Sequence, residues 1–332
     1  MKHIYSLIIL ACMALCLTVP VRAEAACASG DPIRIVTTIF PAYDWAREIL
    51  GDQAENAELT LLADNGVDLH SYSPSVDDIL KISTSDIFIY VGGESDAWAE
   101  DAVREASGQS DIKAVCLMDA VGSALREGEI VEGMEADPDH DESDGGHDEE
   151  SGTAEYDEHV WLSLKNARVC VDAIAAVLGE ADPENAQMYS ANAAAYDEKL
   201  LALDDRFRAA VEDGTLDTVL FGDRFPFRYL MDDYGISYYA AFAGCSAETE
   251  ASFDTIIFLA GKVNELGLHT ILAIEGDSLS MAQTIMDTAG KGELSIGVMD
   301  SMQAVTAEKI EEGTTYLSVM EKNLEVLSAA LA

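Results

Sequence analysis

The sequence predicts an α/β fold of two lobes, each with a mostly parallel sheet covered by helices, joined by one long rigid linker helix. Three observations support this prediction. Short β-branched apolar runs alternate with longer amphipathic stretches, the same plan occurs in both halves of the chain, and a helical region without strand signals lies between them. Near-continuous apolar strands separated by helices are typical of parallel sheets that are covered on both faces.

The first half of the chain alternates between predicted strands and predicted helices. The strands are residues 33–40, 58–62, 86–91 and 112–117. The helices are residues 43–50, 75–82 and 97–106. Gly51 ends the first helix, and the pair Gly92-Gly93 ends the third strand. This order predicts a first α/β lobe over residues 31–180.

The second half repeats the plan. Its predicted strands are residues 218–221, 236–241, 270–274 and 294–298, each followed by a helical stretch. The final stretch, 307–331, is predicted to be one more helix that packs on the second lobe. The second lobe is therefore expected over residues 214–332.

The region between the lobes has a helical composition. A helix is predicted over 166–178, and Asp182-Pro183 then supplies an N-cap with proline at the first helical position. Residues 184–211 are rich in Ala, Leu, Glu and Lys and contain no Gly or Pro before Gly214. A linker helix over 183–213 would be roughly 40 Å long. A single helix of that length joining two lobes is expected to resist wide hinge opening.

The N-terminus predicts export from the cytoplasm. Lys2 precedes an apolar run over residues 4–19, Pro20 ends the run, and Ala23 and Ala25 provide a small-residue cleavage motif. A run of that length is short for a membrane span, so residues 1–26 are interpreted as a signal peptide. A permanent N-terminal anchor is the alternative, and no later segment is long and apolar enough to span a bilayer.

The cysteines leave two questions open. Cys27 follows Ala25 and Ala26 as in a bacterial lipoprotein attachment site, but Glu24 stands where an apolar residue is expected. Lipid attachment through Cys27 and ordinary cleavage are therefore both retained. An oxidising compartment would permit a Cys116–Cys170 bridge, yet spacing alone does not establish one, and buried thiols are favoured.

The charge is strongly negative, with 62 acidic and 19 basic residues and a formal net charge of −43. Nucleic acid is excluded as a natural partner because phosphate contacts need basic patches. Such a surface concentrates cations, although it is equally explained as an adaptation for solubility. Residues 135–158 contain twelve Asp or Glu, His140 and His147, and no Lys or Arg. This stretch cannot bury a core and is predicted to be a mobile loop.

Five side chains fall beyond the carboxyl ends of predicted strands, where ligands bind in open parallel sheets. They are His70, His159, Asp223, Glu275 and Asp300. Two imidazoles from one lobe and carboxylates from the other can close a four-coordinate site for zinc or manganese. Taken singly, each residue has an ordinary explanation as a helix cap or a surface histidine.

Several motifs resemble those of one family, the zinc- and manganese-binding solute receptors of bacterial ABC importers. His70 with Tyr72-Ser73-Pro74-Ser75 looks like the first-ligand motif of that family, and residues 157–163 around His159 resemble the second. Residues 182–185 resemble the start of its linker helix. Ile274-Glu275 and Met299-Asp300 resemble its strand-end carboxylates. The resemblance covers nearly the whole chain after the signal peptide.

The resemblance implies an extracytoplasmic, monomeric receptor that captures Zn²⁺ or Mn²⁺ in an inter-lobe cleft and delivers it to an ABC permease. The alternatives are an extracellular adhesin or metal buffer, or a zinc-dependent hydrolase. A hydrolase is disfavoured because no His-Glu-x-x-His motif occurs, and ATP hydrolysis because there is no phosphate-cradling Gly-rich loop.

One position departs from the pattern of the family. Aligning on Phe227 and Tyr229 places Arg224 where the family has its third ligand, and an arginine has no lone pair for a divalent metal. Asp223, Glu275, a Cys245 thiolate or water could complete the site instead. Two further expectations concern packing: His269 is a structural histidine, and the three tryptophans, Trp45, Trp98 and Trp161, belong to the core.

Overall fold

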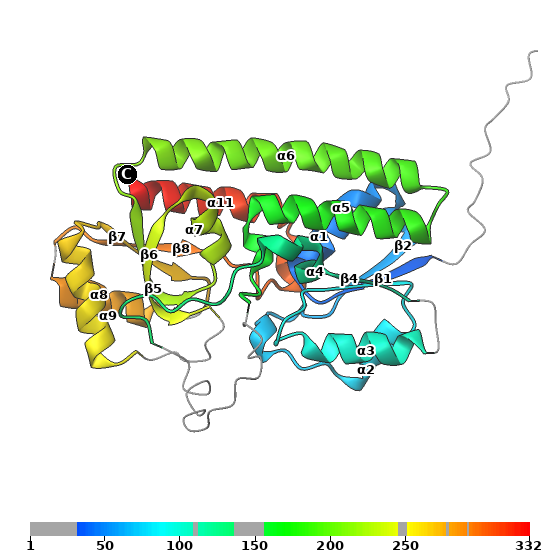
Figure 1. Ribbon diagram of the computed structural model, residues 1–332, viewed down its shortest axis with the longest axis horizontal. Helices are drawn as coiled ribbons and strands as arrows, with labels where there is room; N and C mark the ends of the chain where they lie inside the picture. Colours follow the sequence, from blue (N-terminus) through cyan, green and yellow to red (C-terminus); the bar gives the residue numbers. More distant parts are fainter. Residues whose placement is uncertain (1–31, 109–111, 136–155, 245–250, 277–278, 291) are drawn as a thin grey trace, which may run out of the picture. The chain divides into compact units, whose positions relative to one another are not determined.

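Figure 1 shows a computed structural model of the chain, in which residues 32–108, 112–135, 156–244, 251–276, 279–290 and 292–332 are described. Residues 32–332 form a single structural unit. The predicted signal peptide, Cys27, Cys245 and most of the acidic stretch, with His140 and His147, lie outside the described residues. Within the described residues, no helix is both long enough and apolar enough to cross a membrane.

The first sheet contains four parallel strands in the order β2-β1-β3-β4. The strands are β1 Ile33–Thr37, β2 Ala57–Leu61, β3 Ile87–Tyr90 and β4 Lys113–Cys116. Its helices are α1 Phe40–Leu50, α2 Val76–Ser83, α3 Ala97–Ser107 and α4 Leu117–Val121, with short 3₁₀ turns η1 Gly51–Asn56, η2 Leu69–Ser71, η3 Gly122–Ala124 and η5 Val160–Leu162.

Alternation along the strands explains why helices cover both faces of this sheet. Ile35 and Ile87 belong to one apolar cluster with residues of α1 and α5 (Leu164–Ala181). Their neighbours Val36 and Phe88 belong to a second cluster with residues of α2 and α3. Because successive side chains of a strand point to opposite faces, both faces are buried, as the near-continuous apolar strands predict.

The second sheet repeats this order, as β6-β5-β7-β8, and it is again parallel. Its strands are β5 Thr218–Phe225, β6 Ser237–Ala243, β7 Thr270–Ile274 and β8 Ser295–Met299. Its helices are α7 Arg228–Tyr234, α8 Phe253–Glu265, α9 Ser280–Ala289, α10 Ala307–Glu311 and α11 Tyr316–Leu331. The predicted fold class of two helix-covered parallel sheets is confirmed.

The long helix α6 spans Ala186–Asp213, 28 residues and roughly 42 Å. It runs beside α5, and it contacts α1 near the first sheet as well as α11 and α7 near the second (Figure 1). Its buried side chains recur every three or four residues, which forms one apolar stripe along the helix. The apolar ones are Tyr189, Ala193, Tyr196, Leu200, Leu203 and Phe207. One helix therefore packs against elements of both sheets.

Three local predictions need correction. The helix α6 starts at Ala186 after Asn185, because Asp182 ends α5 and its carboxylate accepts bonds from Asn185 and Tyr189. The predicted helix over 307–331 is two helices, since Gly313 takes a positive φ of 94° and α11 starts again with a capping box. The strand β5 continues to Phe225 through an irregularity in its pairing, so it contains Asp223.

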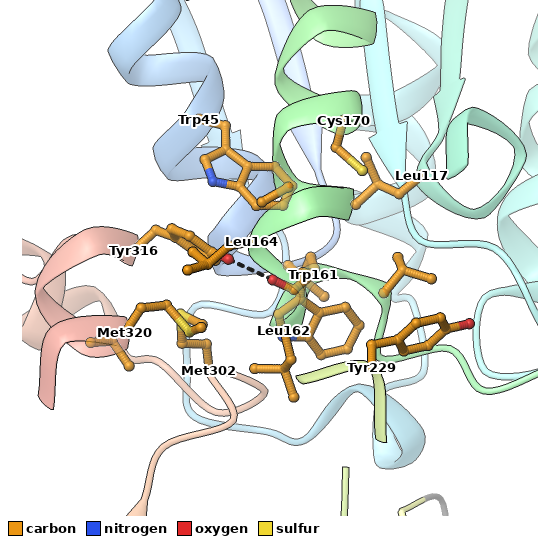
Figure 2. Packing of buried hydrophobic residues seen from close by; sticks show 14 of the residues in the cluster. Trp45, Leu117, Trp161, Leu162, Leu164, Cys170, Tyr229, Met302, Tyr316 and Met320 are labelled. Atoms are coloured by element: carbon orange, nitrogen blue, oxygen red, sulfur yellow. Dashed lines mark hydrogen bonds between the residues drawn. The ribbon is translucent and has the colours of Figure 1, made fainter. Parts of the chain in front are cut away.

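A buried aromatic group connects the two halves of the main core (Figure 2). Trp161 and Tyr316 are fully buried, and the Tyr316 hydroxyl donates to the Trp161 carbonyl oxygen at 2.7 Å. The Trp161 indole N–H donates to the Ser301 carbonyl oxygen at 2.8 Å. Trp45 packs edge-on against Tyr316. The expected core role of the tryptophans is confirmed for these two, and Trp98 packs half-buried against Phe88.

The cysteines that the structure describes, Cys116 and Cys170, are free thiols, as favoured from the sequence. Cys170 is buried in the main core, and burial raises the pKa of Cys116 to about 11. A thiol with a raised pKa is a poor nucleophile at neutral pH, so both side chains act as apolar packing groups.

Asp44 on α1 is a fully buried carboxylate that should make stability depend on pH. It accepts a bond from the Tyr316 backbone N–H at 2.7 Å and pairs with Arg47. Burial raises its pKa from 3.8 to about 6, in spite of these two partners. The folded state therefore binds this proton more tightly than the unfolded state, and the protein loses stability as the pH rises through this window, by roughly 3 kcal/mol.

The Asp44→Asn variant tests this expectation because the amide oxygen can still accept the Tyr316 bond without ionising. Urea unfolding at pH 4, 5, 6 and 7 should show wild type losing unfolding free energy relative to the variant as the pH rises, with the change complete near pH 7. A difference between the two proteins that does not vary with pH would contradict the assignment.

Candidate metal centre

His70 and His159 are positioned by the same local device, an aspartate two residues earlier in the chain. Asp68 Oδ1 accepts the His70 backbone N–H at 3.0 Å, and Asp157 Oδ1 accepts that of His159 at 2.9 Å. Aspartate side chains that bond the backbone two residues on stabilise tight turns. His70 lies in η2 beyond β2, and His159 immediately precedes η5. Both turns are therefore encoded locally.

The two imidazoles meet through their outer nitrogens. His70 Nε2 lies 3.1 Å from His159 Nε2, and the ring planes are inclined at 60°. Two nitrogens bound to one tetrahedral zinc at 2.0–2.1 Å would lie about 3.3–3.4 Å apart. The observed separation is close to that value, so the pair has the geometry of two metal donors.

Asp157 determines which nitrogen of His159 carries its proton. Its Oδ1 lies 2.9 Å from His159 Nδ1, and an ionised carboxylate only accepts hydrogen bonds. The proton of neutral His159 is therefore on Nδ1, and its Nε2 presents a lone pair toward His70. Burial opposes protonation of this ring, but the charge of Asp157 and the bonds to the ring outweigh burial and raise the pKa of His159.

The pKa of His70 shifts in the opposite direction. Burial, followed by the nearby charge of His159, lowers the pKa of His70 to about 4. Its Nδ1 lies 2.6 Å from the hydroxyl oxygen of Ser95. The charge of His159 adds to the effect of burial because two protonated rings at this separation would repel each other. A divalent cation would meet at least one neutral imidazole.

Gln303 is a neighbour of the two histidines that the sequence analysis missed. It is buried, with its Oε1 3.3 Å from His159 Nε2, and its amide nitrogen donates to Ser301 Oγ at 3.0 Å. That second bond directs the amide oxygen toward the histidines. The signal was its position three residues beyond Asp300, but a search for charged or imidazole ligands passes over a glutamine.

Glu275 and Asp300 directly follow β7 and β8, as predicted. Both oxygens of Glu275 bond to Ser301, one to its hydroxyl at 2.5 Å and the other to its backbone N–H at 2.7 Å. Burial, followed by the charge of Asp300, raises the pKa of Glu275 to about 7. Asp300 Oδ1 accepts the Met302 N–H at 2.8 Å. Hydrogen bonds therefore connect Glu275 through Ser301 to Gln303, whose amide oxygen faces His159 Nε2.

Asp223 and Arg224 take different roles within β5. The Asp223 oxygens accept backbone bonds from Arg224 at 2.8 Å and Ile274 at 3.3 Å, which joins β5 to the end of β7. The Arg224 guanidinium forms an ion pair with Asp68 Oδ2 at 3.1 Å. Because Asp68 also shapes the His70 turn, Arg224 links the second sheet to a candidate ligand segment of the first.

The five predicted residues are thus only partly gathered. His70 and His159 are in contact, while in the described part of the chain no three or more His, Cys, Asp or Glu side chains are placed to hold a metal ion. Arg224 remains a departure from the expected pattern, with Asp68 as its partner. His269 is structural, as expected, since its Nε2 lies 3.0 Å from the Ala329 carbonyl oxygen.

Known proteins are similar to this chain over most of its length. The family model described as "Zinc-uptake complex component A periplasmic" (ZnuA) matches residues 35–330. The chain belongs to the ZnuA family. Among curated relatives, the zinc-binding protein AdcA of Streptococcus pyogenes serotype M3 is 30% identical over 92% of this chain. The chain spans 57% of the length of that relative.

Two further relatives of this ZnuA-family chain are similar over most of their own lengths. The high-affinity zinc uptake system protein ZnuA of Bacillus subtilis is 28% identical, over 91% of this chain and 88% of its own. The crystal structure of the Zn(II)-bound ZnuA-like domain of Streptococcus pneumoniae AdcA matches with a TM-score of 0.69 at 26% identity. That match covers 90% of this chain and 99% of the solved chain.

Proposed function

We propose that this chain is the extracytoplasmic receptor of a metal ABC importer, which captures Zn²⁺ and delivers it to a membrane permease. The observation that carries the proposal is the pair of imidazole nitrogens 3.1 Å apart, one of them with its lone pair directed at the other. Two facing nitrogens at this separation are stabilised by a shared cation. The relatives described as zinc-binding and zinc-uptake proteins support zinc as that cation.

The proposed ligands are the Nε2 atoms of His70 and His159, followed by the Gln303 amide oxygen. The carboxylates expected from the sequence, Asp223, Glu275 and Asp300, are proposed to complete the coordination or to neutralise its charge. Imidazole suits zinc, whereas manganese prefers carboxylate, carbonyl and water oxygens. A site with two imidazoles therefore favours zinc, and Mn²⁺ is the alternative cargo.

The same proposal includes the organisation of the chain. Residues 1–26 would be the signal peptide, 31–180 and 214–332 the two lobes, and Ala186–Asp213 the linker helix. The exported receptor would be periplasmic, or tethered through Cys27, and monomeric. It would bind no nucleic acid and catalyse no reaction. Because α6 packs against elements of both sheets, we expect metal capture to involve only a small closure.

Calorimetry and metal analysis of the purified protein test this function. We expect one tightly held Zn²⁺ per chain, weaker binding of Mn²⁺, and a loss of roughly tenfold or more in zinc affinity for His70→Ala. We choose His70 because its turn is bonded through Asp68 to Arg224 of the second sheet, whereas the turn of His159 is not. A protein that binds no divalent metal at micromolar concentration would overturn the proposal. Chelator-sensitive ester or peptide hydrolysis would instead favour an enzyme.

A further inference from the structure

The inner nitrogen of His70 faces two polar residues that are not among the candidate metal ligands. His70 Nδ1 lies 2.6 Å from Ser95 Oγ and 3.7 Å from Glu158 Oε2. Ser95 precedes α3 in the first lobe, whereas Glu158 directly precedes the other histidine, His159. The segment that carries His159 therefore also approaches His70, at the ring nitrogen that does not face His159.

Glu158 is held in place by the turn that carries Ser95. Its Oε1 accepts the Ser95 backbone N–H at 2.9 Å, and its side chain is only 4% exposed. Gly93 makes room for it: Gly93 has a φ of 82°, and a Cβ at that position would lie 2.4 Å from Glu158 Oε1. A glycine is therefore required here, both for the backbone conformation and for the close approach of the carboxylate.

The second oxygen of Glu158 is buried, and it has no hydrogen-bond partner among the described residues. A buried oxygen without a partner costs free energy, so one that is retained beside a ligand ring has a role in binding. His70 Nδ1 lies 3.7 Å from this oxygen. That separation exceeds a normal N–H···O bond by about 0.5–0.8 Å, which a small rotation of the ring removes.

The chemistry of His70 explains the need for such an acceptor. To bind a metal through Nε2, neutral His70 must carry its proton on Nδ1. Ser95 cannot impose that choice, because a hydroxyl both donates and accepts hydrogen bonds. A carboxylate only accepts, so Glu158 favours the proton on Nδ1. Asp157 has the same function for His159, through a bond of 2.9 Å to its Nδ1.

We propose that Glu158, together with Ser95, is the positioning pair of His70, which keeps the His70 proton on Nδ1 and turns the Nε2 lone pair toward the metal position. This inference rests on the proposed function, in that His70 binds the metal through Nε2. Adjacent acidic residues would then serve different histidines, Asp157 its own neighbour His159 and Glu158 the distant His70.

The test compares Glu158→Gln, which keeps the size of the side chain and removes its charge, with Ser95→Ala. Glu94→Gln is the matched control, since Glu94 lies in the same turn with an exposed side chain. The His70 tautomer is measured by ¹⁵N NMR of the ring nitrogens in the metal-free full chain. Zinc affinity is measured by competition with a chelator. A merely structural role would leave the tautomer unchanged.

We expect Glu158→Gln to increase the Nε2–H form of His70 and to weaken zinc binding by roughly 10–100-fold. Ser95→Ala should weaken zinc binding with a smaller change in the tautomer, and Glu94→Gln should change neither. If Glu158→Gln does not fold, Glu158→Asp, which moves the carboxylate away from His70, takes its place with the same expected change in the tautomer. Zinc binding with an unchanged tautomer and affinity in both variants would overturn the positioning role alone. A wild type that binds no zinc would overturn the proposed function, while the tautomer measurement would still decide the role of Glu158.

Discussion

Replacing His159 with alanine is expected to lower the zinc affinity by more than about 100-fold, beyond the range found when a residue outside the ligand shell is lost. The loss of His159 affects more than its own donor atom, Nε2. Its Nε2 lies 3.1 Å from His70 Nε2 and 3.3 Å from Gln303 Oε1, so it is the one residue in contact with both other proposed donors. Without the His159 ring, His70 of the first lobe would no longer be connected to Gln303 of the second lobe.

The control for this variant is His269→Ala, which removes an imidazole of the second sheet that bonds to the Ala329 carbonyl oxygen. Zinc affinity, measured by chelator competition, should be unchanged in the control, and urea unfolding of both variants shows whether each remains folded. A His159→Ala protein that is folded and binds zinc as tightly as wild type would rule out the proposed centre.

The fold could be predicted from the sequence because its signals are local. Every predicted strand overlaps an observed one, since each is a short apolar run bounded by glycine or polar residues. The placement of Glu275 and Asp300 followed from the same reasoning, because a residue that ends a parallel strand lies at the ligand-binding edge. The histidine turns were also encoded locally, each by an aspartate two residues earlier.

The features that the sequence did not predict depend on contacts between residues that are distant in the sequence. Asp223 was expected after its strand, but pairing with β6 continues beyond an irregularity and includes it in β5. Arg224 could be recognised as a departure, yet its partner Asp68 lies 156 positions away. Gln303 faces His159 only because Ser301 orients its amide. Composition and spacing do not reveal such pairs.

Truncating Trp161 to alanine is expected to be the most destabilising single change among the core residues discussed, at about 3–5 kcal/mol. The side chain is fully buried at the centre of the cluster in Figure 2. Its N–H satisfies the Ser301 carbonyl oxygen at 2.8 Å, and the Trp161 carbonyl accepts the Tyr316 hydroxyl at 2.7 Å. The variant would therefore leave a cavity and an unpaired carbonyl between segments of the two lobes.

Trp98→Ala is the matched control, because Trp98 is half-buried on the far face of the first sheet and packs against Phe88. Urea unfolding should show a clearly smaller loss of unfolding free energy for the control. Trp161→Phe separates the two contributions: it keeps most of the volume, so a remaining cost of about 1–3 kcal/mol would report the unpaired Ser301 carbonyl. The indole ring also lies 5.3 Å from the His159 ring, centroid to centroid, so Trp161→Ala should weaken zinc binding as well as folding. If Trp161→Ala costs no more than Trp98→Ala, Trp161 does not join the two halves of the core.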